Sequence, residues 1–221
     1  MKLKKNPFYF LLGGLLISLL VAPIVGARFP AVGGFVFTVT LLVSVLGLSA
    51  SRRLYIAAWT LVAAKVLMDM IGYLHPAKVV FVAEITLMFL FFVLAIVFAL
   101  RRVLDDEFVD LNRIAGAISI YMLIGLLWTC FYFFIALLDP QAFEGIPDLN
   151  THDVALVKNA YTDLLYFSYV TLSTLGYGDI TPTSRAAQSL SYLEAISGVM
   201  YVAVLVSALV GSYGNKRVAR A

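Results

Sequence analysis

The sequence predicts an all-α membrane protein with six transmembrane helices and a shorter re-entrant helix between the fifth and the sixth. Of its 221 residues, 62% are hydrophobic and 13% are charged, whereas a soluble domain carries about a quarter charged residues. The mean hydropathy is +0.96. Six apolar segments come close to the roughly 20 residues that a helix needs to cross the hydrocarbon core of a membrane. They cover residues 8–26, 33–50, 54–74, 79–100, 114–138 and 187–212.

The first segment allows two interpretations. Three lysines precede an apolar run that ends near the Val-Gly-Ala of residues 25–27, and secretory signals share this pattern. The run is longer than the 7–15 residues of a typical signal core, so we expect a retained helix. Cleavage would leave five spans and the same orientation for the rest of the chain.

Positively charged residues are divided unevenly between the two ends of the predicted helices. With the N-terminus inside, the cytoplasmic ends carry Lys2, Lys4, Lys5, Arg52, Arg53, Arg101, Arg102, Arg113, Lys216, Arg217 and Arg220. The external loops carry only Arg28, Lys78, Lys158 and Arg185. Because cytoplasmic loops of membrane proteins are enriched in Lys and Arg, we expect both termini in the cytoplasm and a place in the cytoplasmic (inner) membrane.

The connection between the fifth and sixth segments, residues 139–186, is much longer than the others. It begins polar and becomes apolar over residues 161–175, a stretch too short to cross the membrane. We expect a half-helix over residues 161–172 that enters the membrane and returns through the glycine-rich run that follows. Non-helical backbone at that depth is tolerated only where protein buries it or where it lines a wet cavity.

The glycine-rich run, residues 174–179, reads Thr-Leu-Gly-Tyr-Gly-Asp. Glycine adopts backbone angles that other residues resist, so the glycines on either side of Tyr177 let carbonyl oxygens turn toward one axis. A ring of such carbonyls can replace the hydration shell of a potassium ion. The run resembles the selectivity filter of potassium channels, with Leu175 at the position of the family's usual valine.

This resemblance implies a role for each residue of the run. K+ would bind the carbonyl oxygens of Thr174, Leu175, Gly176 and Tyr177, together with the Thr174 hydroxyl. Gly178 would end the stack, and Asp179 would lie at the outer mouth. Since one loop cannot close a ring, the resemblance implies a homotetramer in membrane lipid. It also implies passive conduction, with K+ as the permeant ion, no cofactor and no enzymatic activity.

Two departures from the family's pattern fall within the expected half-helix. Tyr166 and Phe167 stand where many members carry a tryptophan pair, and Val170 stands where some carry a glutamate that braces the filter aspartate. That brace is missing in this chain. We therefore expect the hydroxyl of Tyr166 or Tyr169 to hold the filter instead.

The sixth segment resembles the inner helix of bacterial potassium channels of the two-span type, including the Leu-Glu-Ala at residues 193–195. Glu194 is an ionisable group inside the membrane, and such groups are functional candidates by default. We expect Glu194 to brace the filter from behind, with a snorkelling or protonated bystander as the alternative. Gly198 is equally consistent with a gating hinge and with a close packing contact, since small residues let transmembrane helices approach.

The first hundred residues resemble the bundle of a voltage-sensing channel only in their number of helices. A voltage sensor carries several arginines on its fourth helix, and the fourth segment here has none before Arg101. We therefore expect little or no voltage sensing. Lys65 and Asp69 lie one turn apart and would pair with each other or with Glu84, in a structural role or as a proton or ligand sensor.

The expected organisation has four parts. Residues 1–100 form a four-helix domain, residues 101–113 a cytoplasmic linker, residues 114–213 the pore domain and residues 214–221 a short cytoplasmic tail. We expect no fused ligand-binding domain in a tail of this length, and no nucleic-acid partner. The single cysteine and the two separated histidines give neither a disulfide nor metal-ligand spacing.

Potassium conduction is the expected function, and three alternatives stay open. A potassium transporter or uptake subunit is one, although uptake proteins of that kind carry four degenerate pore loops in one chain. A non-selective cation channel is the second, if Leu175 prevents selection. A non-conducting sensor or scaffold is the third, and the intact run at residues 174–179 argues against it.

Overall fold

The computed structural model describes residues 7–28, 38, 52–105 and 110–218, and nearly all of them are helical. The helices are α1 (Pro7–Arg28), α3 (Arg52–Leu74), α4 (Lys78–Asp105), α5 (Leu111–Leu138), α6 (Val154–Leu172) and α7 (Arg185–Val218). Two short strands, β1 (Phe143–Glu144) and β2 (Thr181–Pro182), pair antiparallel. The expected segment 33–50 lies outside the described residues, apart from Thr38.

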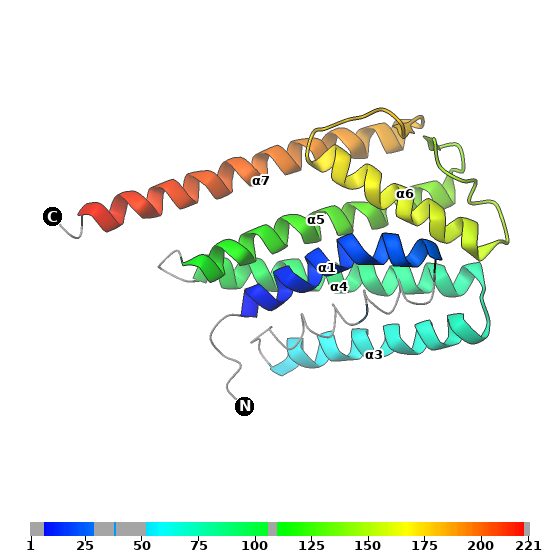
Figure 1. The fold of residues 1–221 in the computed structure, drawn as a ribbon, viewed down its shortest axis with the longest axis horizontal. Helices are drawn as coiled ribbons and strands as arrows, with labels where there is room; N and C mark the ends of the chain where they lie inside the picture. Colours follow the sequence, from blue (N-terminus) through cyan, green and yellow to red (C-terminus); the bar gives the residue numbers. More distant parts are fainter. Residues whose placement is uncertain (1–6, 29–37, 39–51, 106–109, 219–221) are drawn as a thin grey trace.

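Helix α5 lies at the centre of the arrangement (Figure 1). Helices α1, α4, α6 and α7 all pack against α5, and α3 packs against α4 on the far side. In the view of Figure 1, α1, α3 and α5 run in one direction, while α4 and α7 run back. The loop after α6 and the β1–β2 pair therefore lie at the end of the molecule opposite the end of α7.

The described helices are those of a multi-pass membrane protein. Four of them are long and apolar enough to cross a membrane: Tyr55–Leu74, Lys78–Val103, Leu111–Leu138 and Arg185–Ala208. Helix α1 has a shorter apolar stretch, Phe8–Val21. Its Phe8 ring packs on Gly116 of α5, where an added Cβ would lie 2.8 Å from the ring.

Helix α4 differs from the sequence expectation at its end. A separate linker over residues 101–113 was expected, whereas α4 continues to Asp105 and α5 begins at Leu111. No proline or glycine interrupts residues 78–105, so nothing in the sequence stops the helix there. Asp110 caps α5 by accepting a hydrogen bond from the Arg113 backbone N–H at 2.8 Å, which is the usual role of aspartate at an N-cap.

Helix α6 begins seven residues earlier than the expected half-helix. Asp153 caps it by accepting a hydrogen bond from the Ala155 backbone N–H at 2.9 Å. Its first turns contain polar residues, but Val157 and Ala160 are fully buried on the face toward the core. One buried face is enough to hold a helix whose other face is polar.

An aromatic cluster fixes α6 to α4 and α5. Phe81, Phe133 and Tyr161, one from each helix, meet edge to face, with ring centroids 5.6–6.0 Å apart. Aromatic pairs favour this geometry because the ring edge and the ring face carry opposite partial charge. A second edge-to-face set joins α5, β1 and α6 through Tyr132, Phe143 and Phe167.

Candidate functional site

The glycine-rich run begins where α6 ends. The backbone N–H groups of Thr174 and Leu175 donate to the carbonyls of Thr171 and Val170, each at 2.9 Å. These bonds close the last turn of the helix, as is common at helix ends. A helix C-terminus carries partial negative charge, so the run starts next to a group that attracts cations.

Every second residue of the run has a left-handed backbone. The φ angles are 61° at Thr174, 59° at Gly176 and 79° at Gly178, whereas Leu175 and Tyr177 have no positive φ. Glycine adopts such angles without steric cost. The run therefore leaves α6 as non-helical backbone with a left-handed residue at every second position.

Thr174 carries backbone strain at this site. A positive φ is an outlier for a β-branched residue, and Thr174 is the only described non-glycine residue that has one. Strain of this kind costs of order 1–3 kcal/mol and persists where the surrounding structure enforces it. Here the two hydrogen bonds to the end of α6 enforce it.

Residues 173–179 are all exposed in the single chain. The Leu175 side chain is 58% exposed and the Tyr177 side chain 67% exposed. Large apolar groups gathered in one exposed loop mark an interaction surface rather than a free loop. The side of the run that carries Leu175 and Tyr177 therefore presents exposed apolar groups.

Tyr166 ties α6 to the last residue of the run. Its hydroxyl donates a hydrogen bond to Asp179 Oδ2 at 2.7 Å, and this bond raises the pKa of Tyr166. The Ile180 backbone N–H donates to Asp179 Oδ1 at 3.1 Å. Of the two tyrosines expected to hold the filter, Tyr166 contacts Asp179, whereas Tyr169 donates to the Met122 carbonyl in α5 at 2.7 Å.

Glu194 lies in the interior, between three helices. Its side chain is fully buried, and its two carboxyl oxygens lie 2.5 Å from the Tyr132 hydroxyl of α5 and 2.6 Å from the Ser168 hydroxyl of α6. The sequence analysis placed Glu194 behind the filter but did not identify Tyr132 or Ser168. A serine inside the apolar stretch of α6 was the available signal, since buried hydroxyls require partners.

Gly198 lies against the end of α6. A Cβ added at this position would meet the Leu172 carbonyl oxygen at 2.2 Å, closer than real Cβ atoms come to any neighbour. This is the geometry of a close helix packing contact, one of the two expected roles. This contact places α7 directly against Leu172, the last residue of α6 before the run.

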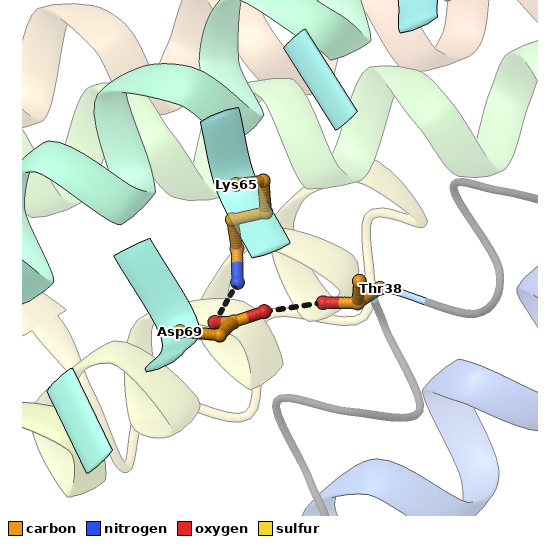
Figure 2. A network of polar contacts seen from close by, with 3 residues as sticks. All are labelled: Thr38, Lys65 and Asp69. Atoms are coloured by element: carbon orange, nitrogen blue, oxygen red, sulfur yellow. Dashed lines mark hydrogen bonds and ion pairs between the residues drawn. The ribbon is translucent and has the colours of Figure 1, made fainter. Parts of the chain in front are cut away.

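The expected intramembrane charge cluster is only partly assembled. Lys65 donates to Asp69 Oδ1, and the Thr38 hydroxyl donates to Asp69 Oδ2 at 2.6 Å (Figure 2). Glu84 faces Gly72 instead, with its Oε1 2.9 Å from where a Cβ would be. Within the described residues, Glu84 makes no hydrogen bond and no ion pair. No group of three or more His, Cys, Asp or Glu in the described part of the chain could hold a metal.

Comparison with known proteins finds similarity to ion channels in the second half of the chain. A family model described as ion channel matches residues 146–213, which include α6, the run and most of α7. The inward rectifier potassium channel Kirbac3.1 of Paramagnetospirillum magnetotacticum is 32% identical over 111 residues, 48% of this chain and 34% of that one. Two-pore potassium channel 1 of Arabidopsis thaliana is 32% identical over 98 residues, 44% of this chain and 22% of that one.

A third relative is potassium channel K2 of Plasmodium berghei (strain Anka), which is 35% identical over 69 residues, 31% of this chain and 5% of that one. The chain thus spans about a third of the length of the bacterial relative and less of the other two. No solved structure matches the chain. The family model places the similarity to ion channels at residues 146–213.

Proposed function

We propose that this chain is one subunit of a potassium-selective channel of the pore-loop class. The observation that carries the proposal is the positive φ at every second residue from Thr174 to Gly178, directly after the end of α6. In such a strand the carbonyl oxygens of residues 174–177 coordinate K+ in place of water. Conduction is passive, and no step of chemistry or cofactor is required.

The functional unit of the proposal is a homotetramer. One chain provides one strand of carbonyls, and a ring around an axis needs several. The exposed Leu175 and Tyr177, together with exposed apolar residues on α7 such as Ile196, Val199 and Met200, provide an apolar surface for neighbouring copies. Transmembrane helices associate through close packing of such faces.

The proposed orientation places both termini in the cytoplasm and the run at the outer side of the cytoplasmic membrane. The excess of Lys and Arg at the expected inner ends supports it. The fourth helix, α4, carries Glu84 and no arginine before Arg101. Helix α4 therefore carries little or no charge that a voltage could move across the membrane. We expect the open probability to respond weakly to voltage.

The test is a reversal-potential measurement on the purified full-length chain in planar lipid bilayers, with potassium on one side and sodium on the other. We expect discrete single-channel steps that reverse near the potassium equilibrium potential and are blocked by barium. The Tyr177→Ala variant is the control, because it removes the exposed ring next to the carbonyl row, and it should lose selectivity.

Three results would contradict the proposal. Steps that reverse near zero would indicate a non-selective cation channel, in which Leu175 prevents the filter from fitting K+. Electrical silence, together with no barium-sensitive rubidium flux into liposomes, would indicate a non-conducting sensor or scaffold. Flux that saturates without single-channel steps would favour a transporter or uptake subunit.

A further inference from the structure

The oxygen atoms around Glu194 form a closed hydrogen-bonded group in the interior of the molecule. Tyr132 and Ser168 contact its two carboxyl oxygens at 2.5 and 2.6 Å. Ser168 Oγ also lies 2.8 Å from the Gly125 carbonyl oxygen. Glu194, Tyr132 and Ser168 are all fully buried, so water does not reach the group to supply further donors.

The number of protons in this group determines the state of the carboxyl. Three short oxygen–oxygen contacts each need one hydrogen between the two atoms. Tyr132 supplies one hydrogen and Ser168 supplies one, because a hydroxyl has a single proton to donate. The Gly125 carbonyl has no proton, and the Thr129 hydroxyl that also contacts this carbonyl, at 2.9 Å, brings its own. The third hydrogen can come only from Glu194.

Among the residues that the structure describes, none places a positive charge beside Glu194 to stabilise a carboxylate. Helix α7 packs against α5, α6 and β2, and the titratable groups that face Glu194 from these elements are three phenols, Tyr121 and Tyr132 of α5 and Tyr169 of α6. The one buried cation among the described residues, Lys65, is paired with Asp69 on α3. An ionised carboxyl buried without a cationic partner is strongly disfavoured.

We propose that Glu194 holds α6 in place as a neutral carboxylic acid. Its proton goes to Ser168 Oγ, the Ser168 proton goes to the Gly125 carbonyl, and the Tyr132 proton goes to the second carboxyl oxygen. The three helices α5, α6 and α7 are thereby joined through one shared proton. Glu194 is a positioning residue: it contacts no ion and acts through α6, whose C-terminal end sets the start of the run.

Removal of that proton at alkaline pH should loosen the group. The two hydroxyl hydrogens would then remain for the three oxygen–oxygen contacts. One pair of oxygen atoms would have no hydrogen between them and would repel each other. The inference rests on the proposed function only in what it means for conduction. The protonation state itself can be measured on a protein that does not conduct, so failure of this inference and failure of the proposed function are separable.

The first experiment is infrared spectroscopy of the full-length protein in liposomes at neutral pH. We expect a carbonyl stretching band of a protonated carboxylic acid that is lost in Glu194→Gln. The same band should stay in Glu144→Gln, the matched control, because Glu144 is exposed. In Ser168→Ala the band should shift to higher frequency, because the acid loses its hydrogen-bond acceptor. A wild-type spectrum that does not differ from that of Glu194→Gln would overturn the proposal.

The second experiment compares potassium flux across a range of pH. The side-chain amide of the Glu194→Gln variant can donate to Ser168 and accept from Tyr132, as the neutral acid does. This variant should therefore keep most of the flux and stay level where wild-type flux falls at alkaline pH. Glu194→Ala should lose flux at every pH. Equal loss in the two variants, or an alkaline decline that is the same in wild type and in Glu194→Gln, would contradict the neutral acid.

Discussion

At Gly198 the backbone of α7 comes close to the end of α6. The Leu172 carbonyl occupies the space that a side chain would need, with 2.2 Å between this oxygen and an added Cβ. A side chain at this position would push α7 away from Leu172 and would displace the start of the run at Thr174. A methyl group here would therefore test how much the site depends on this contact.

Gly198→Ala should destabilise the protein by about 1–3 kcal/mol, the usual cost of overpacking a filled interior. We expect a lower melting temperature in detergent and reduced potassium flux in liposomes. Gly13→Ala is the matched control, since a Cβ at Gly13 meets nothing within 4 Å, and it should leave both measurements unchanged. A Gly198→Ala protein that melts like wild type but opens differently would favour the gating hinge.

Tyr166→Phe removes the hydrogen bond to Asp179 and keeps the ring. Without this donor, the Asp179 carboxylate keeps only the hydrogen bond from the Ile180 backbone N–H among the described residues. We expect conduction to decline faster during prolonged opening and selectivity for potassium over sodium to fall, both measured in bilayers. Tyr73→Phe serves as the control, because Tyr73 is 77% exposed on α3. An unchanged Tyr166→Phe channel would mean that Asp179 needs no support from α6.

At the scale of single residues, the sequence predicted the run because the glycines of a short motif allow backbone angles that other residues resist. Tyr166 was one of the two tyrosines expected to hold the filter. Glycine at every second position is visible in the sequence. The partners of Glu194 were not predictable in the same way. Tyr132 and Ser168 lie 62 and 26 residues away, and only the packing of three helices brings them together.

Helix α3 shows how a charged pair is accommodated inside an apolar element. Lys65 is buried, with 4% of its side chain exposed, and Asp69 is 28% exposed on the same face one turn later. Taking either partner away leaves a charge in an environment that solvates it poorly. The attraction between the two charges therefore contributes little net stability to α3. The main effect of the pair is that neither charge is left without a partner.

Lys65→Met alone and Asp69→Asn alone should each destabilise the protein by about 3 kcal/mol, near the low end for breaking a buried pair because Asp69 is partly exposed. The double variant should recover most of this loss. Melting temperatures of the four proteins in detergent measure the coupling. Additive losses in the double variant would show that the two side chains do not depend on each other, and unaltered flux in all four would argue against a sensing role.

At the scale of elements, apolar length predicted most of the helices well, and capping residues explain the differences. The half-helix was expected to begin at residue 161, where the apolar stretch begins. Asp153 caps α6 instead, so the helix begins seven residues earlier. The end of α4 was expected at residue 100, where the arginines begin. Arginine is a good helix former, and its positive charge suits a helix C-terminus, so α4 continues.

The whole molecule is organised around α5. Both α1 and α4 pack against α5 of their own chain, and the Phe8 backbone N–H donates to Asn112 Oδ1 at 3.2 Å. On the side of the run, the Lys78 ammonium at the start of α4 donates to the Leu149 carbonyl, and Lys158 of α6 lies 5.7 Å from the Phe81 ring centroid. The sequence alone left open whether the first helices pack against their own second half or a neighbour's.

A photoreactive residue in place of Phe8 should cross-link to α5 of the same chain. Subunits of two lengths are mixed, and the products are separated on a denaturing gel. We expect the cross-linked product to run as a single chain, because Gly116 receives the Phe8 ring within one copy. The same residue at Ile24, which is 74% exposed, is the control and should give no protein cross-link. Products with the mass of two chains would mean that α1 packs on a neighbour.

This packing within one chain has a consequence for biogenesis. Helices α1 and α4 can complete their contacts with α5, and α3 its contacts with α4, as soon as α5 has been inserted and before any second copy is met. The apolar side of α7 and the loop after α6 stay exposed in the single chain. Each subunit would already be folded when it meets another copy, and only docking would remain. Mixed assemblies of differently tagged copies should therefore form in the membrane without any subunit being unfolded first.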